Sequence, residues 1–325
     1  MPTSQSVHID SALSRFSVGV MERAGKVFGS FFPITPVDHL SDKYHVVARN
    51  PFLRGDSQPL GPGKESAGHD FTLSQDNFNC VIFGEHADVF TADLNNADNP
   101  RLIEEGASRM ASTNLLLTHE QRFAAGYFKT GVWGTDLTPA NKWDSYGTSD
   151  PLSELETAIE TLLVNGGRPD GAMLKLLLGY RTWKFLKNHP ILLERVKAGG
   201  TSASPAMVSK QALAELLAID EVVVADSVQA TNAAGAAETY DFIFGKHALL
   251  AFVGQNGEGD FMASAGRLFA YKGVNQGSIN DQIVAISIFD VSLAHLHKVR
   301  YEAQMAVDFK VTGAKLGYFI NAAIS

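Results

Sequence analysis

The amino-acid sequence predicts a mixed α+β fold, and three patterns along the chain predict it. A long helical pattern covers about residues 100 to 126, helices and strands alternate over roughly 150 to 255, and the tail alternates like a strand. With 325 residues, 45% of them hydrophobic, the chain can build one large or two ordinary domains with real cores. We therefore expect an ordered protein over most of its length.

The long helix is predicted by its start signals and its apolar spacing. Asn99 is a good N-cap and Pro100 suits the first helical position. Ile103, Ala107, Met110 and Leu117 recur at helical spacing and are expected to form its apolar stripe. At 1.5 Å per residue the helix would be roughly 40 Å long, which is long for a globular core.

The middle of the chain repeats a helix-then-strand order. Asp150 caps a helix that the glycine pair at 166–167 ends. The run AMLKLLLG then predicts a buried strand, and YRTWKFLKNHP a short helix. A capped helix from about Ser209 to Leu217 and a strand from Glu221 to Ala225 follow, and DFIFGKHALLAFV predicts a further strand pair. This alternation favours a compact α/β domain.

Strand patterns also close the chain. In MAVDFKVTG, the apolar residues Val307, Phe309 and Val311 alternate with polar ones, which is typical of a strand with one wet face. We expect residues 260 to 325 to form strands that return to pack on the long helix. At the other end, residues 1 to 43 are expected to form an arm with an extended linker around Pro33 and Pro36.

Residues 44 to 83 are predicted to form a long hairpin. Strand-like YHVVA and FTLSQDNFNCVIF flank NPFLRGDSQPLGPGKESAGHD, whose glycines and prolines prevent a regular element. Loops this long are generally functional or disordered, so we expect a projecting tip that needs a partner surface. The candidate interface residues in this loop are Arg54, Asp56, Lys64, Glu65, His69 and Asp70.

Charge and cysteine content exclude several classes of protein. A net charge of -8 argues against gripping nucleic acid through a basic face, because phosphate contacts need clustered Lys and Arg. The single cysteine, Cys80, excludes an intrachain disulfide framework and is expected to be a small strand hydrophobe. Because no signal pattern and no apolar run of about 18 residues is present, we expect a soluble, unexported protein.

The sequence carries no strong catalytic motif. GPGKES is not a phosphate loop because Lys64 is followed by Glu65, and THEQRF lacks the second zinc histidine because Phe123 holds that position. His295 and His297 would share one face of a strand and could start a metal site, although no third ligand is near. We expect no enzyme activity, no cofactor and no metal, with a metal-dependent enzyme using these two histidines as the alternative from another class.

One aromatic and basic stretch allows two interpretations. In YRTWKFLK, Trp183 and Phe185 lie beside Lys184 and Lys187, and such a set could stack on nucleic-acid bases. An amphipathic helix with its aromatic side buried explains the same pattern. We expect packing rather than base stacking.

Five stretches in a shared order carry a resemblance to a known family. They are RMASTNLLLTHEQRFAAGYF, KWDSYGTSDPLSELETAIETLL, GRPDGAMLKLLLGYRTWKFLKNHPILLERVK, VSKQALAELLAIDEVVVADS and VRYEAQMAVDFKVTGAKLGYFI. Together with the arm and the long loop, they resemble the major capsid proteins of tailed bacteriophages, which have the Hong Kong 97 phage fold. The resemblance covers nearly the whole chain.

The resemblance implies a division of the chain into parts. Residues 1–43 would be the N-terminal arm, 44–83 the extended loop, 84–149 a peripheral domain with a spine helix at 99–127, 150–262 an axial domain, and 263–325 the completion of the peripheral domain. The extended loop would reach over a neighbouring subunit. No cross-link through Lys64 is predicted.

The resemblance also implies a function. The chain would be a structural, late protein of the virion that assembles in the host cytoplasm into pentamers and hexamers of an icosahedral shell. That shell would enclose the double-stranded DNA genome without sequence-specific binding and without a membrane. The expected partners are other copies of the chain, a separate scaffolding protein, a portal and, as an open option, a decoration protein. An encapsulin-type nanocompartment and a tail-tube component are the alternatives.

Overall fold

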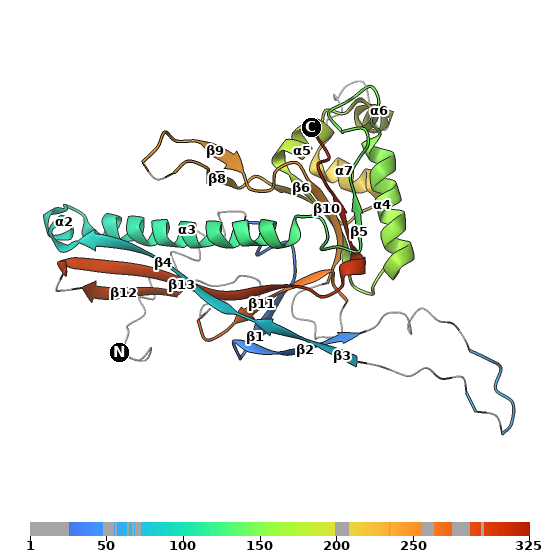
Figure 1. The fold of residues 1–325 in the computed structure, drawn as a ribbon, viewed down its shortest axis with the longest axis horizontal. Coiled ribbons are helices and arrows are strands. Elements are labelled where there is room, and N and C mark those ends of the chain that lie inside the picture. Colours follow the sequence, from blue (N-terminus) through green and yellow to red (C-terminus); the bar gives the residue numbers. More distant parts are fainter. Residues whose placement is uncertain are drawn as a thin grey trace.

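The computed structural model of the chain describes residues 26–47, 55, 57–63, 65–66, 68, 73–198, 208–233, 235–254, 263–274, 287–293 and 296–325. Two five-stranded sheets organise this part of the chain (Figure 1). One sheet lies beneath a single long helix, and the other lies near the end of that helix and carries shorter helices. The α+β class predicted from the sequence is confirmed.

The first sheet is built around its longest strand. Its members are β1 (Ile34–Val37), β4 (Val81–Phe90), β11 (Gly266–Tyr271), β12 (Ser287–Leu293) and β13 (Lys298–Val311). β4 pairs antiparallel with β13 from Lys298 to Val307, while β12 and β11 pair with successive parts of its opposite edge. β1 pairs parallel with β11. The strand predicted at MAVDFKVTG is confirmed as the second part of β13.

The described part of the predicted arm is packed into the subunit. Pro36 lies in β1 at the end of the sheet, a position where a strand tolerates a missing N–H. Just before this strand, Phe28, Phe31 and Phe32 are buried. The extended linker predicted here is therefore an edge strand with an aromatic anchor.

The long helix is α3 (Pro100–Tyr127), as predicted near residues 100 to 126. Its 28 residues correspond to about 42 Å at 1.5 Å per residue. The helix packs along β4 and β13, and the short helix α2 (Thr91–Asn96) connects it to β4. Asn99 occupies the predicted N-cap position, but its side chain makes no capping hydrogen bond.

The buried face of α3 differs from the predicted one. Met110, which was assigned to the apolar stripe, is 60% exposed, and Ile103 is only half-buried. The helix instead buries a face rich in small and polar residues: Ala107, Ser108, Ala111, Ser112, Leu115, Leu116, His119, Glu120, Phe123 and Tyr127. Ala107 is buried as predicted and Leu117 is half-buried, so the prediction was right for part of the stripe and wrong for Met110. Small side chains let the helix lie close to the sheet.

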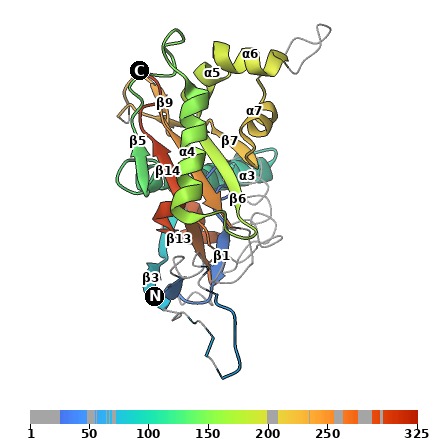
Figure 2. The same ribbon diagram turned by 90° about the vertical axis from the view of Figure 1, so that its right-hand side faces the viewer.

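The second sheet combines segments that are far apart in the sequence. In spatial order its strands are β5 (Thr135–Leu137), β14 (Gly317–Ile320), β10 (Ala248–Val253), β6 (Met173–Gly179) and β7 (Glu221–Ala225). The helices of this region are α4 (Pro151–Gly166), α5 (Tyr180–Leu186), α6 (Pro190–Ala198) and α7 (Lys210–Leu217) (Figure 2). β6 and β7 are parallel, as the predicted helix-strand alternation requires. β5 and β14 come from segments assigned to the peripheral domain, so the division into domains stays a prediction.

Capping groups confirm the helix ends predicted in this region. Asp150 Oδ1 accepts a hydrogen bond from the Ser153 N–H at 3.1 Å, and Ser209 Oγ accepts one from the Ala212 N–H at 3.0 Å. Gly167, with φ of +61°, ends α4 in a conformation that favours glycine. The local signals therefore located these helices correctly.

Two small antiparallel hairpins complete the described structure. β2 (Ser41–Val47) pairs with β3 (Leu73–Asn79), which confirms the strands of the predicted long hairpin. β8 (Val228–Ala230) pairs with β9 (Tyr240–Phe242). The strands predicted in DFIFGKHALLAFV are present as β9 and β10, but they do not pair with each other, and the β8–β9 hairpin was not predicted. This second hairpin extends over the side of α3 (Figure 1). Among the helices described, none is long and apolar enough to cross a membrane.

Candidate assembly surfaces

The β2–β3 hairpin is held at its root by aromatic packing. The rings of Tyr44 and Phe78 lie 5.1 Å and 4.7 Å from the ring of Phe269 on β11. The Tyr44 hydroxyl donates to Asp76 Oδ2 at 2.9 Å. Burial and this carboxylate raise the pKa of Tyr44, so the hydroxyl remains a donor at neutral pH. The hairpin therefore leaves the subunit from a rigid base.

Cys80 follows this hairpin and is buried. Its thiol lies 3.6 Å from the Phe269 carbonyl oxygen. Burial raises the pKa of the Cys80 thiol to about 12, which keeps the sulfur protonated and unreactive. Cys80 thus acts as the small hydrophobe that the sequence predicted, although it lies between β3 and β4 rather than within a strand.

The predicted interface residues of the long loop remain predictions. Glu65 is described and is exposed. The other five, Arg54, Asp56, Lys64, His69 and Asp70, lie outside the described residues.

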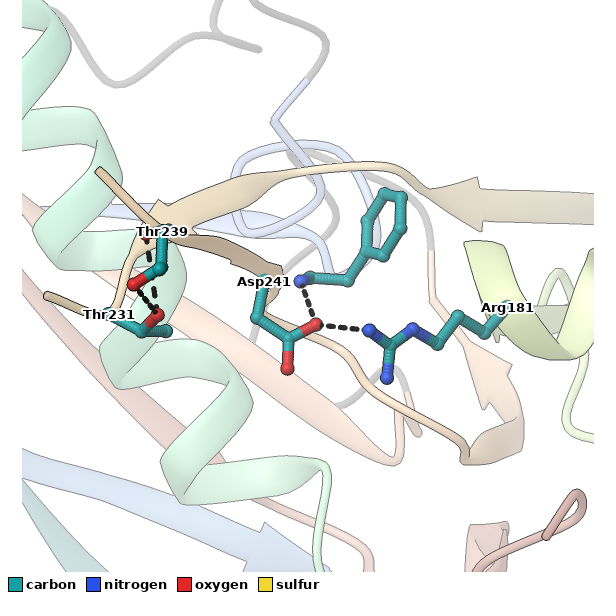
Figure 3. Close-up of polar contacts among 5 residues, drawn as sticks. Arg181, Thr231, Thr239 and Asp241 are labelled. Atoms are coloured by element: carbon teal, nitrogen blue, oxygen red, sulfur yellow. Dashed lines mark hydrogen bonds and ion pairs between the residues drawn. The ribbon is translucent and has the colours of Figure 1, made fainter. Parts of the chain in front are cut away.

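The β8–β9 hairpin is a second projecting surface. Val228 and Tyr240 are 42% and 62% exposed. A pair of threonines, Thr231 and Thr239, closes the hairpin through a backbone bond and a 2.9 Å contact between their hydroxyls (Figure 3). The strands are only three residues long, and an isolated two-stranded hairpin is marginally stable in water. This hairpin therefore depends on its root.

Two clamps hold that root. On α5, Arg181 donates to Asp241 Oδ1 at 2.7 Å (Figure 3). The ring of Tyr180, also on α5, stacks on Phe242 with the ring centroids 5.2 Å apart. On α3, Gln121 Nε2 donates to Gln229 Oε1 at 2.9 Å. The sequence patterns did not predict this hairpin, because Ala, Gly and Thr dominate it; the turn-forming run TNAAG was the available signal.

His119 is a buried polar residue in the middle of α3. Its ring lies among the aromatic rings of Phe28, Phe83 and Phe309, with centroids 5.7, 5.4 and 6.5 Å away. Burial and the nearby Arg122 cation lower the pKa of His119 to about 3. The imidazole is therefore neutral in the folded subunit at physiological pH.

The structure does not assemble the histidine pair considered as a metal site. His297 lies in the turn between β12 and β13 with φ of +53°, so it is not a strand residue as the one-face argument required. His295 lies outside the described residues. Within the described ranges, no group of three His, Cys, Asp or Glu side chains could hold a metal ion.

One serine-histidine pair escaped the sequence search. Ser149 Oγ lies 3.1 Å from His189 Nε2, and both side chains are buried. The serine hydroxyl already donates to the Ser145 carbonyl oxygen at 2.9 Å. His189 Nδ1 has no hydrogen-bond partner among the described residues, so they supply no third member of a triad. This geometry fits an interior packing contact.

The aromatic stretch in α5 also packs inward. Trp183 is buried, whereas Lys184 is exposed and lies over the Phe185 ring at 5.8 Å. The packing interpretation is therefore confirmed for Trp183.

Comparison with known proteins identifies the fold. No protein-family model matches the chain, and no curated protein sequence matches it. A phage-related protein from Bordetella bronchiseptica RB50 is 21% identical, with a TM-score of 0.70 over 98% of each chain. The cyanophage P-SCSP1u capsid structure is 13% identical, with a TM-score of 0.57 over 92% of this chain and 89% of the other. An encapsulin complex from Synechococcus elongatus PCC 7942 is 11% identical, with a TM-score of 0.52 over 100% and 90%.

These likenesses define the class of fold. The chain has the Hong Kong 97-type capsid fold that its sequence order predicted, with the long helix, the extended hairpin and the second sheet all present. The match extends over 98% of both chains in the first comparison.

Proposed function

We propose that the chain is a major capsid protein, which assembles into the pentamers and hexamers of an icosahedral phage head around double-stranded DNA. The observation that carries this proposal is the fold match to a cyanophage capsid over 92% of this chain and 89% of that one. The proposed role is structural rather than enzymatic. The proposed place is the virion, after assembly in the host cytoplasm.

The projecting hairpins support this proposal physically. A closed shell needs heterologous contacts, in which different patches of identical subunits meet. β2–β3 and β8–β9 leave the body of the subunit from anchored roots, and Tyr240 on the second is exposed. Many such contacts act together and give a shell avidity that no single contact has. The net charge of -8 suits a container that does not hold DNA through basic walls.

The domain roles expected from the sequence belong to the same proposal. Residues 1–43 form the arm, 44–83 the loop that reaches a neighbour, 84–149 with 263–325 the peripheral domain, and 150–262 the axial domain. Scaffolding, portal and decoration proteins are the proposed further partners.

A nanocompartment shell is the second candidate, and a specific observation favours it. The encapsulin complex shares this fold with a TM-score of 0.52 over the full length of this chain. A nanocompartment would enclose a cargo protein instead of a genome. The content of the particle therefore separates the two functions.

Electron microscopy of the purified full chain tests the proposal. The chain is expressed alone and together with a candidate scaffolding protein, and particle diameter and nucleic-acid content are measured. Closed shells built from pentamers and hexamers, containing DNA when isolated from phage-producing cells, are the expected result. Shells with a protein cargo and no DNA would support the nanocompartment, while monomers under both conditions would contradict either shell function.

A further inference from the structure

A buried carboxylate on α3 joins two segments that are far from it in the sequence. Glu120 is fully buried, and its Oε1 and Oε2 accept hydrogen bonds from the N–H groups of Val27 and Phe28 at 3.1 and 3.0 Å. These N–H groups begin a turn in which the Phe31 N–H donates to the Val27 carbonyl oxygen at 2.9 Å. The carboxylate thus caps the first N–H groups of this turn, as a side-chain oxygen caps a helix.

The same carboxylate holds the root of the β8–β9 hairpin. Ser227, the residue before β8, donates from Oγ to Glu120 Oε1 at 3.0 Å. The Ser227 carbonyl oxygen accepts the Ile243 N–H, just after β9, at 3.0 Å, so this residue closes the hairpin at its base. Lys26 Nζ reaches Ser227 Oγ at 3.3 Å. The N-terminal turn and the hairpin root therefore meet at one side chain.

The energetics of a buried charge make these contacts interdependent. Burial raises the pKa of Glu120, while the hydrogen bonds from Phe28, Val27 and Ser227 and the charge of Lys26 act against that rise. Leaving a buried charged acceptor unsatisfied costs more than losing an ordinary hydrogen bond. When one donor leaves, the carboxylate is less well solvated by the protein, and the remaining donors lose a well-oriented partner.

We propose that Glu120 is a latch that couples the seating of the N-terminal turn, residues 26–31, to the position of the β8–β9 hairpin. When the N–H groups of Val27 and Phe28 bond to the Glu120 carboxylate, its Oε1 is held in place to accept the Ser227 hydroxyl, and the hairpin root lies against α3. Displacement of either segment loosens the other. The coupling goes beyond shell formation, because it is a property of the single subunit.

The location of the latch gives it a consequence for the exposed surface. The adjacent residue Gln121 binds Gln229 inside the hairpin, so consecutive residues of α3 hold consecutive parts of the root. Phe28 and Phe31 of the turn, and Phe32 just after it, are buried in the core. These rings anchor the turn, while the N–H groups of Val27 and Phe28 link it to the hairpin root through Glu120.

Hydrogen-deuterium exchange on the full-length chain tests the coupling. Ser227→Ala removes one donor from the hairpin side, and exchange is read by mass spectrometry in peptides covering residues 26–32. Ser227 also contacts the turn directly, through Lys26 Nζ at 3.3 Å, so Lys26→Met, which removes that contact and keeps Glu120, is measured beside it. A purely local role of Ser227 would leave the amides of Val27 and Phe28, which bond to Glu120, no more exposed to exchange than they are in Lys26→Met. We expect their exchange to rise at least about twofold, the lower bound for coupling between contacts that share one hydrogen-bond network.

Two further variants complete the test. Glu120→Gln replaces one acceptor oxygen by an NH₂ group and is expected to raise exchange in both residues 26–32 and 226–243. Thr231→Val, which removes the exposed hydroxyl contact at the hairpin tip, is the matched control and is expected to raise exchange only in the hairpin.

Unchanged exchange at residues 26–32 in Ser227→Ala would overturn the latch, as would a Glu120→Gln effect confined to one segment. If Glu120→Gln fails to fold, the milder Ser227→Ala variant still decides. All variants are compared in the same assembly state, checked by sedimentation. Because no shell is needed, the result is independent of the proposed capsid function.

Discussion

His119 and Glu120 are consecutive buried residues of α3 whose pKa values shift in opposite directions, each toward the neutral form. Burial, with Arg122 nearby, lowers the pKa of His119 to about 3, and burial raises the pKa of Glu120. His119 faces aromatic rings, whereas Glu120 faces the hydrogen-bond donors of the N-terminal turn and the hairpin root. The two residues therefore make opposite contributions to the pH dependence of the unfolding free energy.

Mild acid should destabilise the subunit through His119. An unfolded histidine binds a proton near pH 6.5, but the folded His119 does so only near pH 3, so stability falls as the pH drops from 6.5 toward 3. Between pH 6.5 and 5 the loss attributable to His119 is about 1.5 to 2 kcal/mol. Urea unfolding of the wild type and of His119→Leu at several pH values measures how steeply the unfolding free energy of each protein changes with pH.

Comparing the wild type with His119→Leu isolates the contribution of His119 to the pH dependence of stability, although Glu120 contributes a pH dependence of the opposite sign. Its raised pKa contributes stability below the unfolded value of about 4.5, and this stability is lost as the pH rises through the folded pKa. Glu120 is present in both proteins, so its effect largely cancels. His297→Gln, a change at an exposed turn, is the control. If the unfolding free energies of the wild type and His119→Leu changed equally with pH, His119 would not be the source of the acid destabilisation.

Glycine substitutions should separate close packing from helix propensity. A Cβ added at Gly317 would overlap the ring of Trp133, whereas one added at Gly106 would meet nothing within 4 Å. We expect Gly317→Ala to cost about 1 to 3 kcal/mol of unfolding free energy by overpacking. Gly106→Ala, at an exposed helical position, should gain about 0.5 to 1 kcal/mol. Thermal unfolding measures both, and a tolerated Gly317→Ala would show that Trp133 can move.

Local signals located α3 and α4, but the arrangement of the sheets needed information that is not local. Asp150 and Gly167 mark helix ends within a few residues of themselves. By contrast, β14 pairs with β5 across more than half of the chain, and such pairing leaves no short-range pattern. Met110 was placed on the wrong face because the true buried face uses alanine and serine, which carry little hydrophobic signal.

Of the two projecting hairpins, only one could be predicted from local sequence patterns. The β2–β3 hairpin was predictable because its strands flank an unusually long glycine- and proline-rich loop. The β8–β9 hairpin was not, since its strands are only three residues long and the segment between them, TNAAGAAET, is typical of a loop. Glu120 meets donors about 90 and 107 positions away, so no spacing rule could have selected it.

Breaking the α5 clamp should loosen the β8–β9 hairpin without unfolding the subunit. The side chains of Arg181 and Asp241 are 43% and 45% exposed, and exposed ion pairs are worth less than about 1 kcal/mol. Arg181→Met should therefore lower the global stability by less than that amount. Hydrogen exchange in residues 228–242 should rise, because strands of three residues depend on the contacts at their root. Arg168→Met, which breaks a comparable exposed pair with Asp220, should leave the hairpin unaffected.

Tyr240 should matter for assembly but not for folding. Its side chain is 62% exposed on a projecting strand, so Tyr240→Asp should change the unfolding free energy by less than about 0.5 kcal/mol. If the hairpin contacts a neighbouring copy in the proposed shell, a charge at this position desolvates poorly and the yield of closed shells should fall at least tenfold. Tyr240→Phe keeps the ring, loses only the hydroxyl bond to Glu238, and should assemble like the wild type. Electron microscopy and sedimentation measure the yield, and normal shells from Tyr240→Asp would place this side chain outside the interfaces while leaving the capsid function intact.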